Sequence, residues 1–223
     1  MKISDWKISI FREARMTFRQ MGSWVNGLCF FLLIGWVYQL LIATGTTLSP
    51  QLSASLIWVL SLLSIMLVSD QWISRDIETG LIDAWLAQRR SLLTFMRVKL
   101  LVQWLVVSGL LVVLCPILAL QLGLEAHLIP WLMLSIGIGG LGCICFCGLG
   151  AVITASQSQS GVLLSVLVLP FNIPSLVFGI GVVSMQAESF NPLPVLAILT
   201  AISVSAFTLL PFGMAYAAKI VNE

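Results

Sequence analysis

Long apolar runs alternate with short polar segments along the whole chain. The runs cover 24–43, 52–69, 100–121, 128–153, 161–184 and 195–218, and none contains Asp, Glu, Lys, Arg or His. A helix needs roughly 20 apolar residues to cross a hydrocarbon core of about 30 Å. Because the backbone inside lipid must satisfy its own hydrogen bonds, the pattern predicts an all-α protein with six transmembrane helices. We expect residues 1–223 to form one transmembrane domain.

The first 22 residues show a different pattern. On a helix, Ile3, Trp6 and Ile10 lie on one side, and Arg12 and Arg15 lie on the other. An apolar face opposite a basic face is typical of helices that lie in the membrane interface. The sequence therefore predicts an interfacial amphipathic helix before the first span.

The distribution of basic residues predicts the orientation. All 11 Lys and Arg residues precede the first run, lie between the second and third runs, or follow the sixth. The segments 44–51, 122–127 and 185–194 contain none. Basic connections stay on the cytoplasmic side, so we expect both termini in the cytoplasm.

Five cysteines fall inside apolar runs, where thiols behave as small hydrophobic groups, so no disulfide is expected. Gly139, Cys143, Cys147 and Ala151 recur every fourth residue and predict a smooth ridge for close helix packing. Cys145 would point away from this ridge, which argues against a shared metal site. No metal site is predicted.

The fifth run contains two prolines around an amide, Pro170, Asn172 and Pro174. Each proline removes a backbone donor and disturbs the preceding turn. Two interpretations remain open: a helix break or hinge that lines a path, and a static kink buried in the bundle.

The single histidine, His127, lies beside Glu125 in a predicted outer connection. It is the one candidate for cofactor binding, as a haem or metal ligand, although a lone surface histidine more often has no such role.

The sequence lacks residues that several kinds of binding and catalysis require. No lysine follows a glycine, so the phosphate-binding motif G-x-x-x-x-G-K-[ST] is absent. The apolar runs carry no ionisable group for a proton relay or an intramembrane protease. We expect no enzyme activity, and any energy must come from another chain through a cytoplasmic loop.

One connection stands out, because residues 70–99 hold nine charged residues. Gly80 divides it, since glycine accepts a sharp change of backbone direction. Beyond Gly80 the chain predicts a short amphipathic helix with one apolar face, formed by Leu81, Ile82, Trp85 and Leu86. From this pattern alone, the helix either rests on the bilayer or docks on a partner.

This loop resembles the first cytoplasmic loop of ABC-2-type ABC transporter permeases. Arg75, Asp76, Gly80, Ile82 and Asp83 match the pattern of those permeases. Residues 87–90, Ala-Gln-Arg-Arg, depart from it where a proline is common. Over nearly its whole length the chain is similar to the CcmB family, the haem exporter permeases of cytochrome c maturation, most specifically at 161–178.

The resemblance implies a coupling helix that docks on a separate ATPase subunit. Arg75, Asp76, Glu78 and Asp83 would make polar contacts, Gly80 the turn, and the apolar face would fill a groove of the ATPase. Implied partners are two copies of the ATPase CcmA, a second copy of this chain, CcmC, CcmD and the haem chaperone CcmE, in the bacterial inner membrane.

The implied function is haem export or ATP-driven release of haem-loaded CcmE. ATP would act through the partner, and haem would be transported or handled rather than held as a cofactor. The alternative is a non-transporting scaffold that remodels a haem-handling complex.

Overall fold

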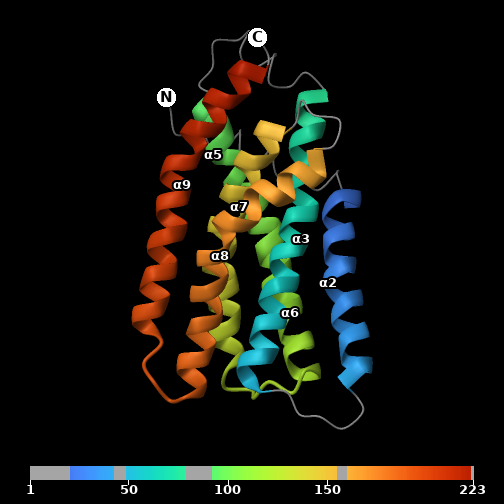
Figure 1. Ribbon diagram of the computed structural model, residues 1–223, viewed down its shortest axis with the longest axis vertical. Coiled ribbons are helices and arrows are strands. Elements are labelled where there is room, and N and C mark those ends of the chain that lie inside the picture. The colour runs from blue at the N-terminus through green and yellow to red at the C-terminus, as the bar shows by residue number, and fades with distance from the viewer. Residues whose placement is uncertain (1–20, 43–48, 79–91, 155–159, 222–223) are drawn as a thin grey trace.

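The computed structural model describes residues 21–42, 49–78, 92–154 and 160–221, and within them every regular element is helical. The helices form an elongated bundle (Figure 1). Their bounds are α2 (Met21–Ile42), α3 (Pro50–Glu78), α5 (Leu92–Gln103), the π-helix η1 (Trp104–Ser108), α6 (Gly109–Gln121), α7 (Ile129–Thr154), α8 (Ser160–Ala187) and α9 (Leu193–Val221).

Five helical stretches are long and apolar enough to cross a membrane: Pro50–Ser69, Leu92–Gln121, Ile129–Thr154, Val166–Ala187 and Leu193–Ala218. They confirm the predicted all-α class and coincide with five of the six predicted runs. The apolar part of α2, Trp24–Leu40, is shorter. The predicted first span, 24–43, therefore stays a prediction. The predicted interfacial helix lies outside the described residues except for its last two positions, which begin α2.

The third span is longer than predicted. Its helix begins at Leu92 rather than near residue 100, so Arg97 and Lys99 are part of it, and Lys99 is buried. The earlier boundary followed hydropathy, which marks only the apolar part of a helix. Arginine and lysine are good helix formers, so the helix continues through them.

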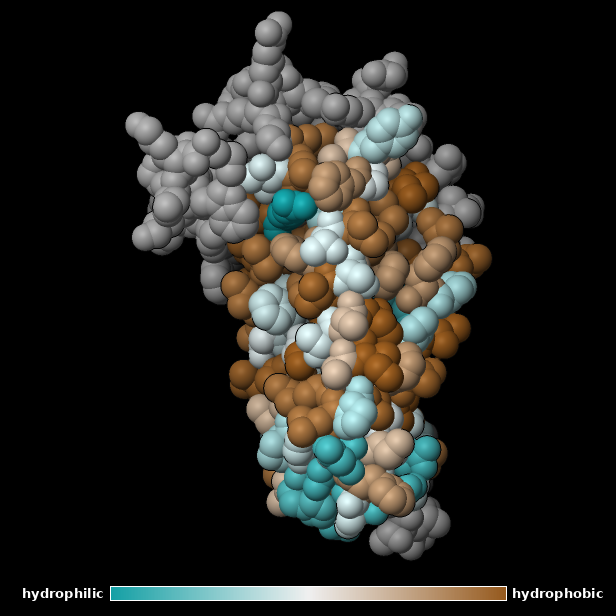
Figure 2. Space-filling model, turned by 90° about the vertical axis from the view of Figure 1, so that its left-hand side faces the viewer, coloured by the Kyte–Doolittle hydropathy of each residue, from teal (hydrophilic) through white to brown (hydrophobic). Residues whose placement is uncertain are grey.

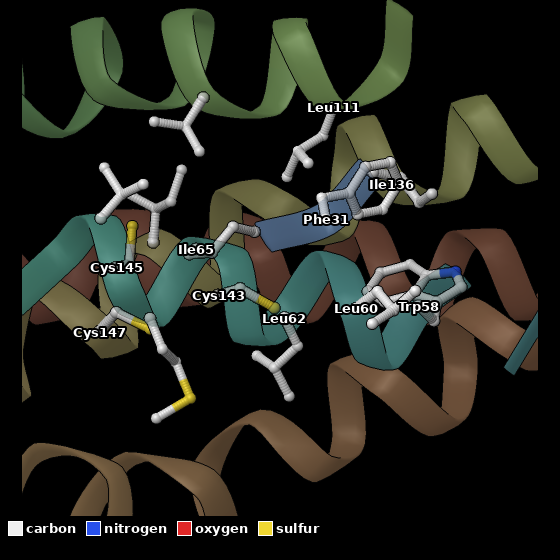
Figure 3. Packing of buried hydrophobic residues seen from close by; sticks show 14 of the residues in the cluster. Phe31, Trp58, Leu60, Leu62, Ile65, Leu111, Ile136, Cys143, Cys145 and Cys147 are labelled. Carbon is white, nitrogen blue, oxygen red and sulfur yellow. The ribbon is translucent and has the colours of Figure 1, made fainter. Parts of the chain in front are cut away.

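The buried Trp58 side chain of α3 packs against α7 and α8 (Figure 3). A Cβ atom added at Gly139 of α7 or at Gly179 of α8 would collide with its indole ring. The indole Nε1 donates a hydrogen bond to Ser135 Oγ at 3.1 Å, and this hydroxyl donates to the Leu132 carbonyl at 2.9 Å. The two glycines therefore let α3 approach α7 and α8 closely.

The predicted ridge on α7 is confirmed as a packing surface, because Gly139, Cys143, Cys147 and Ala151 are all buried. All five cysteines lie in the described helices as free thiols. The Cys145 side chain points away from those of Cys143 and Cys147, as the helical period predicts (Figure 3).

Two short connections, 122–128 and 188–192, close the bundle at the end opposite the C-terminal end of α9 (Figure 1). We call this the loop end. After α6, the Leu124 amide donates to the Ala119 carbonyl at 2.9 Å. After α8, the Phe190 amide donates to the Met185 carbonyl at 2.8 Å. Both are Schellman motifs, which satisfy carbonyls at the ends of helices.

The sides of the bundle are apolar, whereas hydrophilic residues gather at the loop end on the face that Figure 2 shows. Large apolar side chains such as Phe171 of α8 and Leu209 of α9 are exposed along the helices. Such a surface suits lipid or another membrane-embedded chain.

Candidate functional site

The predicted ATPase-coupling segment begins at the end of α3. The backbone of α3 continues through Arg75, Asp76 and Glu78. The remaining predicted residues, Gly80, Leu81, Ile82, Asp83, Trp85 and Leu86, lie outside the described residues. The coupling helix and its contacts therefore stay predictions, and the structure supplies the helices on both sides of the segment.

These flanking helices reach deep into the bundle. The far end of α3 is tied to the loop end, where Ser53 Oγ donates to the Leu122 carbonyl at 3.0 Å. Between Ser53 and Glu78, the same helix carries the interlocked Trp58. A displacement of the Glu78 end is thus applied to one continuous helix that contacts the core and the opposite end.

On the other side of the segment, α5 and η1 make polar contacts with two helices. The Arg97 guanidinium lies over the Phe212 ring of α9, 5.2 Å from its centroid. The Trp104 indole donates to the Gly137 carbonyl of α7 at 2.8 Å. The helical stretch that begins at Leu92 therefore contacts both α9 and α7.

The π-helix η1 was not predicted, and no residue type within it signals one. A π-turn accommodates one extra residue per turn and is often found at functional positions. It follows directly after the buried polar pair Lys99 and Gln103.

The predicted hinge lies in α8, which is helical through both prolines. Pro170 and Pro174 are exposed, while Asn172 between them is fully buried. The ribbon of α8 changes direction along its length (Figure 1), but the helix is not interrupted. The structure thus shows a bend without a break, and a moving hinge stays a prediction.

Asn172 faces the ridge of α7 that contains Cys143 and Cys147. Its Nδ2 donates to the Val168 carbonyl at 3.2 Å and lies 3.8 Å from Cys147 Sγ. The amide therefore joins the bent part of α8 to the centre of α7.

His127 is an exposed residue of the loop end. Its Nδ1 lies 3.3 Å from Glu125 Oε2, and both side chains are more than half exposed. Among the described residues, no three His, Cys, Asp or Glu side chains come close enough to hold a metal ion. The haem-ligand candidate thus has a single carboxylate neighbour in this part of the chain.

Comparison with known proteins places this architecture in a family. Residues 6–221 match the family described as CcmB protein. The chain is 32% identical to Heme exporter protein B of Pseudomonas aeruginosa over 94% of both chains. It is 31% identical to the protein of that name from Paracoccus denitrificans, over 96% of this chain and 98% of the other. It is 34% identical to the protein of that name from Escherichia coli K12, over 96% of this chain and 97% of the other. The chain belongs to the CcmB family.

Proposed function

We propose that this protein is the membrane permease subunit of a haem export system that serves cytochrome c maturation. Its relatives carry the name Heme exporter protein B, and five of its described helical stretches are of transmembrane length. The sequence has no P-loop, so a separate ATPase subunit supplies the energy. The chain itself is not an enzyme in this proposal.

The observation that carries the proposal is the continuity of α3. This helix extends from the loop end, past Trp58, to Glu78, immediately before the charged segment. An ATPase that moved residues 75–86 would push on a helix with little freedom to bend independently of α7 and α8. The predicted coupling helix would receive this motion from the ATPase and pass it to α3.

The finer assembly follows from the resemblance. Two copies of CcmA and two of this chain form the core, with CcmC, CcmD and CcmE beside them. The exposed face of α8 supports a second copy as its cover. Pro170 and Pro174 leave the Val166 and Pro170 carbonyls without their usual donors, and such groups are tolerated in a membrane where protein or a water-filled cavity lies against them. The bundle lies in the bacterial inner membrane with both termini in the cytoplasm.

A second function is release of haem-loaded CcmE without passage of haem through this chain. The position of the only histidine favours it, because His127 lies at the exposed loop end rather than among the helices. In that case the protein transmits force as a scaffold. A wide polar cavity between the two copies would favour transport, whereas a sealed apolar interface would favour the scaffold.

The test replaces the central aromatic residue of the coupling segment, Trp85→Ala. Truncation of a buried interface anchor often costs about 2 kcal/mol, or about 30-fold in Kd. We expect a loss of this order in the affinity for the ATPase, measured by titration into nanodiscs.

Trp36→Ala is the matched control, because Trp36 is an exposed aromatic residue of α2 outside that segment. It should leave the affinity unchanged. Equal affinity and equal ATPase stimulation for wild type and Trp85→Ala would refute the coupling role.

A further inference from the structure

A partly exposed arginine interrupts the apolar flank where α5 lies beside α9. The Arg97 guanidinium lies over the Phe212 ring, 5.2 Å from its centroid, and the Phe212 side chain is 54% exposed. The other basic residue of α5, Lys99, is buried. Arg97 is therefore the cation that α5 presents at the surface of the bundle.

The Arg97 guanidinium has no anionic partner in the part of the chain that the structure describes. Neither α5 nor α9 contains Asp or Glu. The acidic residues of the described helices at this end belong to α3, which lies on the other side of the bundle from α9 in Figure 1. Within the described ranges, Arg97 contacts the Phe212 ring and no hydrogen-bond acceptor, so its five N–H donors are available to a further acceptor.

Helix length places this pair at the level of the lipid headgroups. The stretch from Leu193 to Phe212 spans about 30 Å at a rise of 1.5 Å per residue, which equals the thickness of a hydrocarbon core. Measured from Gln121 along α6, η1 and α5, Arg97 lies at about 35 Å. With the loop end at one face of the membrane, Arg97 and Phe212 lie at the opposite face, which the basic residues predict to be cytoplasmic.

Phosphate is the anion that suits this arrangement. The aromatic ring under the guanidinium holds its plane, and the N–H groups along the edge of that plane match two phosphate oxygens. Tyr216 lies one turn beyond Phe212 on the same face of α9 and is 70% exposed, so its phenol adds an O–H donor. Toward the middle of the membrane, Leu209 and Val204 are exposed on α9 and offer an apolar surface to acyl chains.

The charge balance selects among phospholipids. Arg97 carries a positive charge, and neither α5 nor α9 supplies a carboxylate that could pair with an ammonium or choline group. A headgroup with a net negative charge therefore fits better than a zwitterionic one.

We propose that Arg97, Phe212 and Tyr216 form a binding site for the phosphate of one anionic phospholipid between α5 and α9. The bound lipid joins these two helices near Leu92, where α5 begins after the predicted coupling segment. The inference rests on the geometry of this flank and holds whether or not haem passes through the protein.

Native mass spectrometry of the full-length protein in neutral detergent tests the site. Dioleoyl phosphatidylglycerol and dioleoyl phosphatidylcholine share their acyl chains and a phosphate but differ in net charge. We expect the first phosphatidylglycerol to bind with an apparent Kd about fivefold lower than that of phosphatidylcholine. Equal Kd values would show that Arg97 merely reaches water and would overturn the proposal. Displacement of the lipid by equimolar inorganic phosphate would overturn it in favour of a free-anion site.

Two variants assign the selectivity to these residues. Arg97→Gln should raise the Kd for phosphatidylglycerol about five- to tenfold and leave that for phosphatidylcholine unchanged. Phe212→Leu keeps an apolar side chain but removes the ring, and should raise the Kd about threefold. Phe190→Leu is the matched control, because Phe190 is 60% exposed at the loop end in a connection without basic residues, and it should leave both Kd values unchanged.

The double variant shows whether the ring acts through the guanidinium. Once Arg97 is replaced by Gln, Phe212→Leu should have almost no further effect on the Kd, because its role is to orient the cation. Independent, additive effects would overturn the joint site, as would wild-type lipid selectivity in either single variant. If Arg97→Gln does not fold, the comparison of Phe212→Leu with Phe190→Leu decides.

Discussion

Single residues with a left-handed backbone fix both connections at the loop end. Gly123 has φ of 72° and Ser189 has φ of 61°, and each is the second residue beyond a helix that ends in a Schellman motif. Glycine adopts this conformation without strain, whereas a side chain pays roughly 1–2 kcal/mol for it. The two connections share the same backbone geometry, but the conformational strain is larger at Ser189 than at Gly123.

This inequality gives a paired prediction. Ser189→Gly should stabilise the protein by about 0.5–1 kcal/mol, because it removes the strain, and Gly123→Ala should destabilise it by about 1 kcal/mol. The unfolding midpoint in detergent, followed by size-exclusion fluorescence, measures both. A lower midpoint for Ser189→Gly would contradict the assigned strain.

The direction of a side chain could be predicted where it depends on the geometry of a single helix. The 100° step per residue suffices to separate Cys145 from Cys143 and Cys147. The contact of Trp58 with Gly139 and Gly179 could not be predicted in this way, since it depends on the register of three helices.

At the scale of elements, α8 contains two prolines inside the helix, whereas α6 and α9 contain one each. Its two prolines lie on the exposed side and Asn172 on the buried side. The two prolines therefore weaken the helix on the side that faces lipid or a partner, while Asn172 holds it on the side that faces the core. That combination permits a hinge but equally permits a permanent bend.

Proline replacement separates these two interpretations. Pro170→Ala and Pro174→Ala restore the lost donors, and helix propensity favours alanine by up to about 3 kcal/mol. We expect a straighter, more stable α8 together with reduced maturation of c-type cytochromes in cells. Pro211→Ala in α9, also a proline inside a helix, should leave maturation intact. Unchanged maturation in all three variants would show a static kink.

The elements themselves were largely predictable, because apolar length dominates in a membrane protein. The start of α5 at Leu92 was missed, since Arg97 and Lys99 lower the hydropathy without ending the helix. The π-helix Trp104–Ser108 was missed because nothing in its composition distinguishes it from the α-helices around it.

At the scale of the whole molecule, α3, α7 and α9 reach from the loop end to the end that carries the charged segment (Figure 1). The basic residues predict which end is cytoplasmic. Of the predicted site, the structure describes the hinge region and His127, while most of the coupling segment lies outside the described residues. Its assignment rests on family membership and on the helices that flank it.

Reporter fusions test the orientation. Alkaline phosphatase inserted after Ala126 or after Ser189 should be active, because both connections lack basic residues and are predicted to face outward. Green fluorescent protein fused after Glu223 should fluoresce, because the C-terminus is predicted to be cytoplasmic. Inactive phosphatase at both positions would invert the topology.

The brevity of the connections at the loop end limits how another protein can recognise this one from that side. Of the described residues at this end, 122–128 and 188–192 are held tightly against the helix ends, so these two connections offer a small platform. A stable interface usually takes about 20–30 residues from each partner. A lasting partner of these two connections must therefore also contact the flanks of the helices. It would need a membrane anchor of its own, and a purely water-soluble protein could make only a brief encounter there.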